Sequence, residues 1–175
     1  MAAPHVTGIA GLLLSVNPNL TPSQIRNIIQ QTAEDKGATG FDNYYGYGRV
    51  NAYKALKYTL ENYGGTLTQS LTIPSGETWN FQPGVMIKFA SGASLIVNGT
   101  LNAVGNSNSR ITFTRSGTSG TWGGIKFNSG SSGSVQFCNI SYANYGIHLY
   151  TSPSNIIVSD NIITNGMSGF IVSKP

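Results

Sequence analysis

The sequence predicts an α + β chain in two parts, with helices in residues 1–63 followed by a parallel β-helix. Apolar residues recur with helical spacing in the first part. From Gly64 onward the pattern changes to short alternating runs separated by turns rich in Gly, Asn and Ser. Three similar phrases also begin at Gly124, Gly146 and Gly169, which are 22 and 23 positions apart. This spacing predicts stacked coils of about 22 residues.

The first predicted helix follows the segment Met1-Ala2-Ala3-Pro4-His5-Val6 and ends at Asn17-Pro18. Its apolar stripe consists of Ile9, Leu12, Leu13 and Val16. Because Ala10 and Leu14 lie on other faces, the helix is apolar nearly all round and is expected inside a domain. Glycine inside a helix costs about 1 kcal/mol relative to alanine. Gly8 and Gly11 therefore predict that neighbouring backbone passes close by.

Two further helices are predicted before Gly64. Thr21, Pro22 and Gln24 form a capping box with proline at the first helical position, so a helix starts there. Its buried stripe is Ile25, Ile28 and Ile29, and its predicted end is Lys36-Gly37-Ala38. Asn51 is expected to cap the third helix, which Gly64-Gly65 ends. The inward residues of that helix are predicted to be Ala52, Ala55, Leu56 and Leu60.

The segment Met1-Ala2-Ala3-Pro4-His5 resembles the stretch that follows the nucleophile in subtilisin-like serine proteases (subtilases). The resemblance implies that the nucleophilic serine would immediately precede Met1, and that the family's Asp and His would lie earlier still. None of the three catalytic residues would then be in this sequence, and His5 would have a structural role. We therefore expect residues 1–63 to be the incomplete C-terminal helical part of a peptidase domain, without activity alone.

Residues 37–48 form a loop rich in Gly and Tyr. Its end, Gly46-x-Gly48-Arg49-Val50-Asn51-Ala52, resembles the segment that closes the subtilase catalytic domain. That resemblance favours tyrosines that pack inside the domain. The alternative is that the tyrosines stack on a ligand.

Composition and charge favour a secreted, β-rich protein. Only 9% of residues are charged, against about 25% in an average soluble domain. The net charge of +4 is spread thinly, so nucleic acid is not expected as a partner. No stretch reaches the 18 or so apolar residues of a membrane span, and no signal peptide is recognised. Cys138 is the sole cysteine and is expected to be a buried structural thiol rather than a reactive one.

Short strands are predicted throughout the second part. Clear examples are Leu71–Ile73, Val85–Phe89, Ser94–Val97 and Ile111–Phe113. In a β-helix, Ile125, Ile147 and Phe170 would form one inward column. Asn139 and Asn161 would stack at a turn through their side-chain amides. The alternative fold is an antiparallel sandwich in which the spacing is coincidental.

The phrases Phe89–Leu101 and Gly120–Ile125 resemble right-handed β-helix domains of the pectin-lyase type, found in secreted and cell-surface bacterial proteins. The resemblance covers roughly residues 67–175. We expect residues 64–84 to be a linker with the first strands, and residues 85–175 to be a right-handed β-helix that is incomplete at its C-terminal end.

No catalytic or metal site is predicted in the second part. Glu77 and Asp160 are its only carboxylates and stand far apart in the sequence, so neither calcium binding nor glycoside hydrolysis is expected. His148 alternates with apolar neighbours and is expected to be an ordinary surface residue. Ser119 follows Gly-Thr, but no helix follows it, so it is not expected to be a nucleophile. No cofactor is expected.

Two functional hypotheses follow. The first is part of a secreted subtilisin-like endopeptidase, whose substrate is a polypeptide, with a β-helix accessory domain. The second is a non-catalytic module that binds a polysaccharide or another cell-surface ligand through the β-helix. The expected location of the intact parent is extracellular or at the cell surface.

Overall fold

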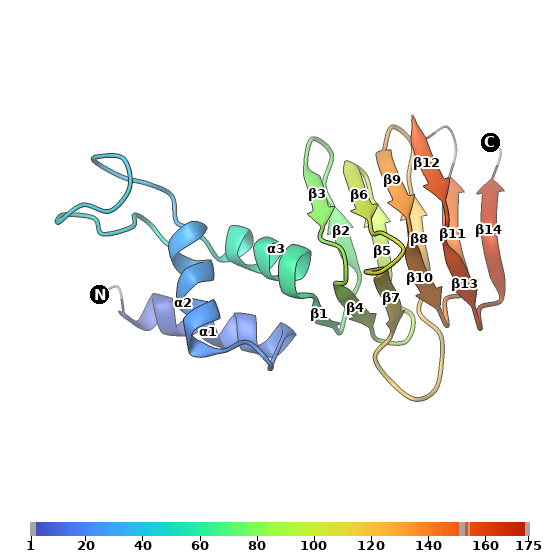
Figure 1. The fold of residues 1–175 in the computed structure, drawn as a ribbon, viewed down its shortest axis with the longest axis horizontal. Helices are drawn as coiled ribbons and strands as arrows, with labels where there is room; N and C mark the ends of the chain where they lie inside the picture. Colours follow the sequence, from blue (N-terminus) through green and yellow to red (C-terminus); the bar gives the residue numbers. More distant parts are fainter. Residues whose placement is uncertain (1–2, 151–152, 154, 174–175) are drawn as a thin grey trace. The chain divides into compact units, whose positions relative to one another are not determined.

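The computed structural model describes residues 3–150, 153 and 155–173, and it shows three helices followed by a parallel β-solenoid (Figure 1). The chain divides into two compact units, Met1–Tyr63 and Gly64–Pro175. The first unit holds all of the described helices and the second all of the described strands. The predicted two-part α + β fold is confirmed.

The first unit consists of α1 (Ala3–Val16), α2 (Pro22–Gln31) and α3 (Ala52–Tyr63). Its buried core is a small cluster of Ile9, Leu13, Leu20, Ile28, Ile29 and Ala55. The predicted capping box is present at the start of α2. The Thr21 amide donates to Gln24 Oε1 at 2.8 Å, and Thr21 Oγ1 accepts from the Gln24 amide at 3.3 Å. Asn51 caps α3 by accepting a hydrogen bond from the Lys54 amide at 2.9 Å.

Two predictions about these helices are wrong in detail. Helix α2 ends at Gln31, several residues before the predicted stop at Lys36. It ends there because Thr32 closes the last turn, and Glu34 then pairs with Arg49 through two backbone hydrogen bonds. On α3, Ala52 is exposed rather than inward. Thr59 is buried instead, and its hydroxyl donates to the Ala55 carbonyl at 2.8 Å.

The second unit is built from three parallel sheets. The first sheet contains β1 (Gly65–Leu67), β4 (Met86–Phe89), β7 (Ile111–Arg115), β10 (Cys138–Ser141) and β13 (Ile162–Thr164). The second contains β2 (Leu71–Ile73), β5 (Ser94–Val97), β8 (Gly124–Phe127), β11 (Tyr145–Tyr150) and β14 (Ser168–Ser173). The third contains β3 (Thr78–Phe81), β6 (Thr100–Val104), β9 (Ser132–Gln136) and β12 (Ile156–Ser159). The first four coils visit the three sheets in turn, the fifth contributes β13 and β14, and all of these strands pair in parallel, which rules out the antiparallel sandwich.

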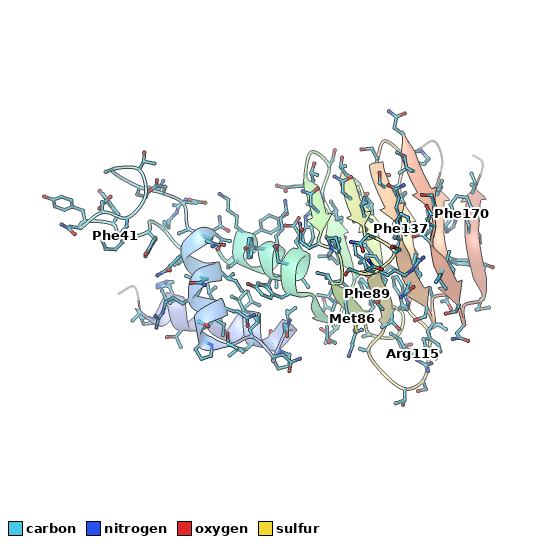
Figure 2. All side chains as sticks on the ribbon, in the orientation of Figure 1. Phe41, Met86, Phe89, Arg115, Phe137 and Phe170 are labelled. Carbon is cyan, nitrogen blue, oxygen red and sulfur yellow. The ribbon has the colours of Figure 1, made fainter. Side chains whose placement is uncertain are left out.

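The predicted column of Ile125, Ile147 and Phe170 is confirmed by the strand register. Ile147 is aligned with Ile125 on one side and with Phe170 on the other. Ile125 and Ile147 are fully buried, whereas Phe170 is 50% exposed on β14, the last strand of the second sheet (Figure 2). The column continues to Leu95, but Leu95 and Ile125 are 30 positions apart. Longer loops in the middle coils therefore interrupt the 22-residue period without disturbing the stack.

The predicted stacking of Asn139 on Asn161 is wrong. Asn139 is aligned with Ile162, one position further along the chain. The Asn161 side chain instead bonds to backbone in the preceding coil, accepting from the Cys138 amide at 2.8 Å and donating to the Val135 carbonyl at 2.7 Å.

Asparagine pairs of the expected kind do form between other coils of the solenoid. Asn102 donates to Asn80 at 2.9 Å. Asn128 donates to Asn98 at 2.7 Å.

Aromatic and apolar side chains fill the solenoid interior. Phe89 and Trp122 stack with ring centroids 4.6 Å apart, and the Trp122 indole donates to the Ser141 carbonyl at 2.8 Å. Cys138 is fully buried, and burial raises the pKa of its thiol to about 12. The prediction of a buried structural thiol is confirmed, because such a thiol stays protonated at neutral pH.

Candidate functional site

The predicted motif residues lie at the beginning of α1. Met1 and Ala2 fall outside the described residues. Ala3, Pro4 and His5 form the first described turn of α1, and all three are exposed. Their expected role next to a nucleophile stays a prediction.

Helix α1 is covered on one face only. Ile9, Leu13 and Val16 are buried, while Leu12 is 38% exposed and Leu14 39% exposed. A residue with a Cβ at Gly8 or Gly11 would meet nothing within 4 Å, so the prediction of close backbone at these glycines is wrong for this structure. The prediction of a helix buried nearly all round is therefore wrong for this unit, and Leu12 of the predicted buried stripe is exposed.

An apolar groove of about 490 Å³ lies between α1, α2 and the segment that precedes α3. Its walls include Val6 and Ala10 of α1, Ile25 and Ile29 of α2, and Val50. Burial of apolar surface is the main stabilising contribution in folding. A further layer of structure that covered this groove would therefore stabilise the unit.

A polar network ties the start of the loop between α2 and α3 to its end. The Arg49 guanidinium forms an ion pair with Glu34, and Asn51 Nδ2 donates to Glu34 Oε1 at 2.8 Å. Hydrogen bonds from Arg49 and then from Asn51 hold the pKa of Glu34 below its ordinary value. The sequence pattern did not reveal this network, because Glu34 is 15 positions from Arg49.

The network predicts an acid-sensitive loop. A carboxyl group with a lowered pKa contributes stability above its unfolded-state value, here near 4.5, and that contribution is lost as the pH falls through the lower folded-state value. We expect amide exchange in residues 35–48 to accelerate as the pH drops below about 4.5, after correction for intrinsic exchange rates. Glu34→Gln should weaken this pH dependence, while Glu77→Gln in the other unit should leave it unchanged. An unaltered profile in Glu34→Gln would contradict the prediction.

The tyrosines of this loop are exposed, so the packing interpretation is wrong for this unit. Tyr44 is 93% exposed, Tyr45 60% and Tyr47 47%. Phe41, which lies in the same loop and packs edge-on to Tyr47 at 5.2 Å, is 64% exposed (Figure 2). Such a concentration of exposed rings is typical of a contact surface.

His148 differs from its prediction as an ordinary surface residue. It lies on the outward column of β11, aligned with Lys126 and Ile171, yet it is only 6% exposed. The rings of Tyr145 and Tyr150 flank it, with centroids 5.3 and 3.8 Å away. Burial first, and then the Lys126 charge, lower the pKa of His148.

The described residues contain no group of three or more His, Cys, Asp or Glu side chains placed to hold a metal ion. Ser119 is exposed in the loop before β8, and none of the described residues after it forms a helix. None of the helices that the structure describes is long and apolar enough to cross a membrane.

Comparison with known proteins finds a family match within the first unit. Residues 1–48 match the subtilase family. The match covers α1, α2 and the tyrosine loop of residues 37–48, and it includes the Met1–His5 motif.

Several curated subtilase relatives are similar over about a third of this chain. Thermitase from Thermoactinomyces vulgaris is 50% identical over 58 residues, which are 33% of this chain and 19% of thermitase. Fervidolysin from Fervidobacterium pennivorans is 46% identical over 65 residues, 37% of this chain and 9% of fervidolysin. An extracellular serine protease from Serratia marcescens is 48% identical over 56 residues, 32% of this chain and 5% of that protease. The chain thus spans a small part of these relatives. No solved structure matches the chain.

Proposed function

We propose that this chain is part of a secreted subtilisin-like serine endopeptidase that hydrolyses peptide bonds in polypeptides. Residues 1–63 are the C-terminal helical part of its catalytic domain. Residues 64–84 hold a linker and first strands, and residues 85–175 belong to a right-handed β-helix accessory domain. In the intact protein, a serine directly before Met1 attacks the peptide carbonyl, a histidine accepts its proton, and an aspartate orients the histidine.

The uncovered apolar face of α1 carries this proposal, together with the subtilase similarity of residues 1–48. Helix α1 leaves Leu12 and Leu14 exposed, and its groove with α2 is lined by apolar side chains. A catalytic domain that packs a further layer against these surfaces would bury them. The N-terminus of α1 would then lie next to the nucleophile, where backbone N–H groups help to stabilise the oxyanion.

The 175-residue chain by itself is expected to be inactive. It should hydrolyse no peptide substrate and should not be labelled by serine-directed phosphonates, because the proposed nucleophile and its partners lie outside this sequence. Mass spectrometry after incubation with a fluorophosphonate probe measures this, with thermitase as the positive control. Labelling at any serine of the chain would contradict the proposal.

A segment exchange tests the proposed role directly. Thermitase whose matched 58-residue segment is replaced by the corresponding segment of this chain should keep peptidase activity within about tenfold of the parent. A matched chimera with Leu13→Asp should lose activity, because Leu13 is fully buried in the helical core and a buried unpaired charge is strongly destabilising. An inactive but folded first chimera would argue against the catalytic-domain assignment.

A second candidate function concerns the β-solenoid as a polysaccharide-binding module. The rings of Tyr145, His148 and Tyr150 form a continuous aromatic row on β11, and both tyrosines are more than a third exposed. Exposed aromatic faces can stack on sugar rings. Binding to insoluble polysaccharides by the full chain, and its loss in a Tyr145→Ala, Tyr150→Ala variant, would support this function. If the polysaccharide retains the full chain and the double variant equally, this candidate function is contradicted.

A further inference from the structure

Two Asn-Gly dipeptides occur in the chain, Asn98-Gly99 and Asn165-Gly166. In such a dipeptide the backbone nitrogen of the glycine can attack the side-chain amide carbon of the asparagine, because glycine has no Cβ to hinder the approach. Both dipeptides lie at bends of the β-solenoid, and each follows a β-branched residue, Val97 or Thr164. A difference in reactivity between them therefore reflects the surroundings that the fold provides.

The fold ties down both reacting groups of Asn98-Gly99. The Asn98 side-chain oxygen accepts a hydrogen bond from Asn128 Nδ2 at 2.7 Å, and the Gly99 amide donates to the Ile73 carbonyl at 3.2 Å. Asn128 follows β8 of the next coil, whereas Ile73 ends β2 of the preceding coil. Gly99 is also buried. Ring closure at this dipeptide would therefore require hydrogen bonds to break on both sides of the coil.

The second dipeptide has no such restraint. Asn165 and Gly166 lie in the bend between β13 and β14, and both are exposed. No residue that the structure describes forms a hydrogen bond with the Asn165 side chain or with the Gly166 amide. The Thr164 carbonyl accepts from the Tyr142 amide at 3.1 Å, and the next hydrogen bond to the preceding coil comes from the Met167 amide. The interval between these two bonds is the Asn-Gly dipeptide itself.

The geometry of the bend favours this pair of residues. A Cβ on Gly166 would lie 2.6 Å from the Ala143 carbonyl oxygen, which belongs to the backbone of the preceding coil. Asn165 has a φ of 54°, in the left-handed region that asparagine adopts more readily than most residues. The fold therefore selects an Asn-Gly dipeptide at this bend and leaves it open to water.

We propose that Asn165 is a site of spontaneous deamidation. The Gly166 backbone nitrogen gives up its proton to water and forms a bond to Asn165 Cγ. The bond from Cγ to Nδ2 breaks, and Nδ2 leaves as ammonia with a proton taken from water. Water then adds to either carbonyl of the cyclic imide and opens it, which leaves aspartate or isoaspartate at this position. Water is the only co-reactant, no electrons are transferred, and the proposal is independent of the proposed catalytic function.

The isoaspartate product changes the connection into the last described strand. Its main chain runs through the side-chain carbon, so the path from β13 to β14 becomes longer, and a negative charge is added at the bend. Strand β14 pairs with β11 alone among the described strands. Because register depends on the geometry of the connecting turn, the longer path should weaken this pairing and loosen the terminal coil.

Ageing of the full chain in heavy-oxygen water at mildly alkaline pH tests the proposal. Each conversion takes its new oxygen atom from the solvent, so peptides digested afterwards in ordinary water carry the heavy label only where the intact protein reacted. Fragmentation in the mass spectrometer then assigns the label to a residue. We expect Asn165 to convert at least tenfold faster than Asn98.

Two controls separate the effect of the fold from that of the dipeptide. In urea, where neither dipeptide is protected, the two asparagines should convert at similar rates. Asn165→Gln should abolish the fast conversion and leave Asn98 unchanged, because a glutamine side chain closes the imide ring much less readily. Equal rates in the folded chain, or a difference that persists in urea, would overturn the proposal.

The consequence for the terminal coil is measured separately. The isoaspartate form, isolated by ion exchange, should show faster amide exchange in β14 and unchanged exchange in β8. Asn165→Asp is the matched control, because it adds the charge without lengthening the main chain, and its β14 should exchange as in the parent. Unchanged exchange of β14 in the isoaspartate form would overturn the predicted loosening.

Discussion

Gly124→Ala is expected to destabilise the β-solenoid by about 2–6 kcal/mol. Gly124 begins β8 with a φ of +94°, where any other residue is strained by about 1–3 kcal/mol. A Cβ at this position would lie 1.5 Å from the Tyr145 carbonyl oxygen, which is in the neighbouring strand β11. The strands must therefore move apart, and displacing well-packed structure costs about 1–3 kcal/mol more.

Tryptophan fluorescence during urea unfolding measures this effect without interference from the helices, because Trp79 and Trp122 both lie in the second unit. Gly169→Ala is the matched control. Gly169 occupies the same place in the repeated Gly-x-x-x phrase on β14, but a Cβ there would meet nothing within 4 Å. Its substitution should change the unfolding free energy by less than about 0.5 kcal/mol. Similar losses in both variants would contradict the role assigned to the Tyr145 contact.

Hydrogen exchange is expected to differ by orders of magnitude between the two units. Residues 1–63 should exchange fast, because the core cluster that the structure describes there is small and Leu12 and Leu14 of α1 are exposed. Residues 85–165 should exchange slowly, since each coil is hydrogen-bonded to its neighbours and inward columns such as Leu95, Ile125 and Ile147 are fully buried.

Mass-spectrometric exchange on the intact chain measures both units in one sample, so the solenoid serves as the internal control for the helices. Leu13→Ala should accelerate exchange in α1 and α2 without affecting β8. Strong protection across α1, equal to that of β8, would show that the helical unit is stable without a further layer. The proposal that it belongs to a larger catalytic domain would then lose its structural support.

The candidate site was predictable from sequence only in part. The Met1–His5 motif and the helix behind it pointed to subtilases, and the similarity of residues 1–48 to that family agrees. The family resemblance favours packing of Tyr44 and Tyr45 over ligand binding, and nothing in their spacing shows whether a neighbouring layer covers them. The contact between Gly37 and the Asp42 carboxylate forms only when the loop closes, so the sequence alone does not show it.

The sequence by itself determined the features that depend on local spacing. The capping box at Thr21, the Asn51 cap and the stop after Tyr63 follow from chemistry within one helical turn. The parallel coils follow from the repeat that places Ile125, Ile147 and Phe170 in one column. Tertiary structure decided the features that depend on register and neighbours. A shift of one position pairs Asn139 with Ile162 instead of Asn161, and two flanking tyrosines bury His148. The physical reason is that a periodic pattern specifies which face a side chain occupies, whereas its partners come from segments brought together by loops whose lengths vary between coils.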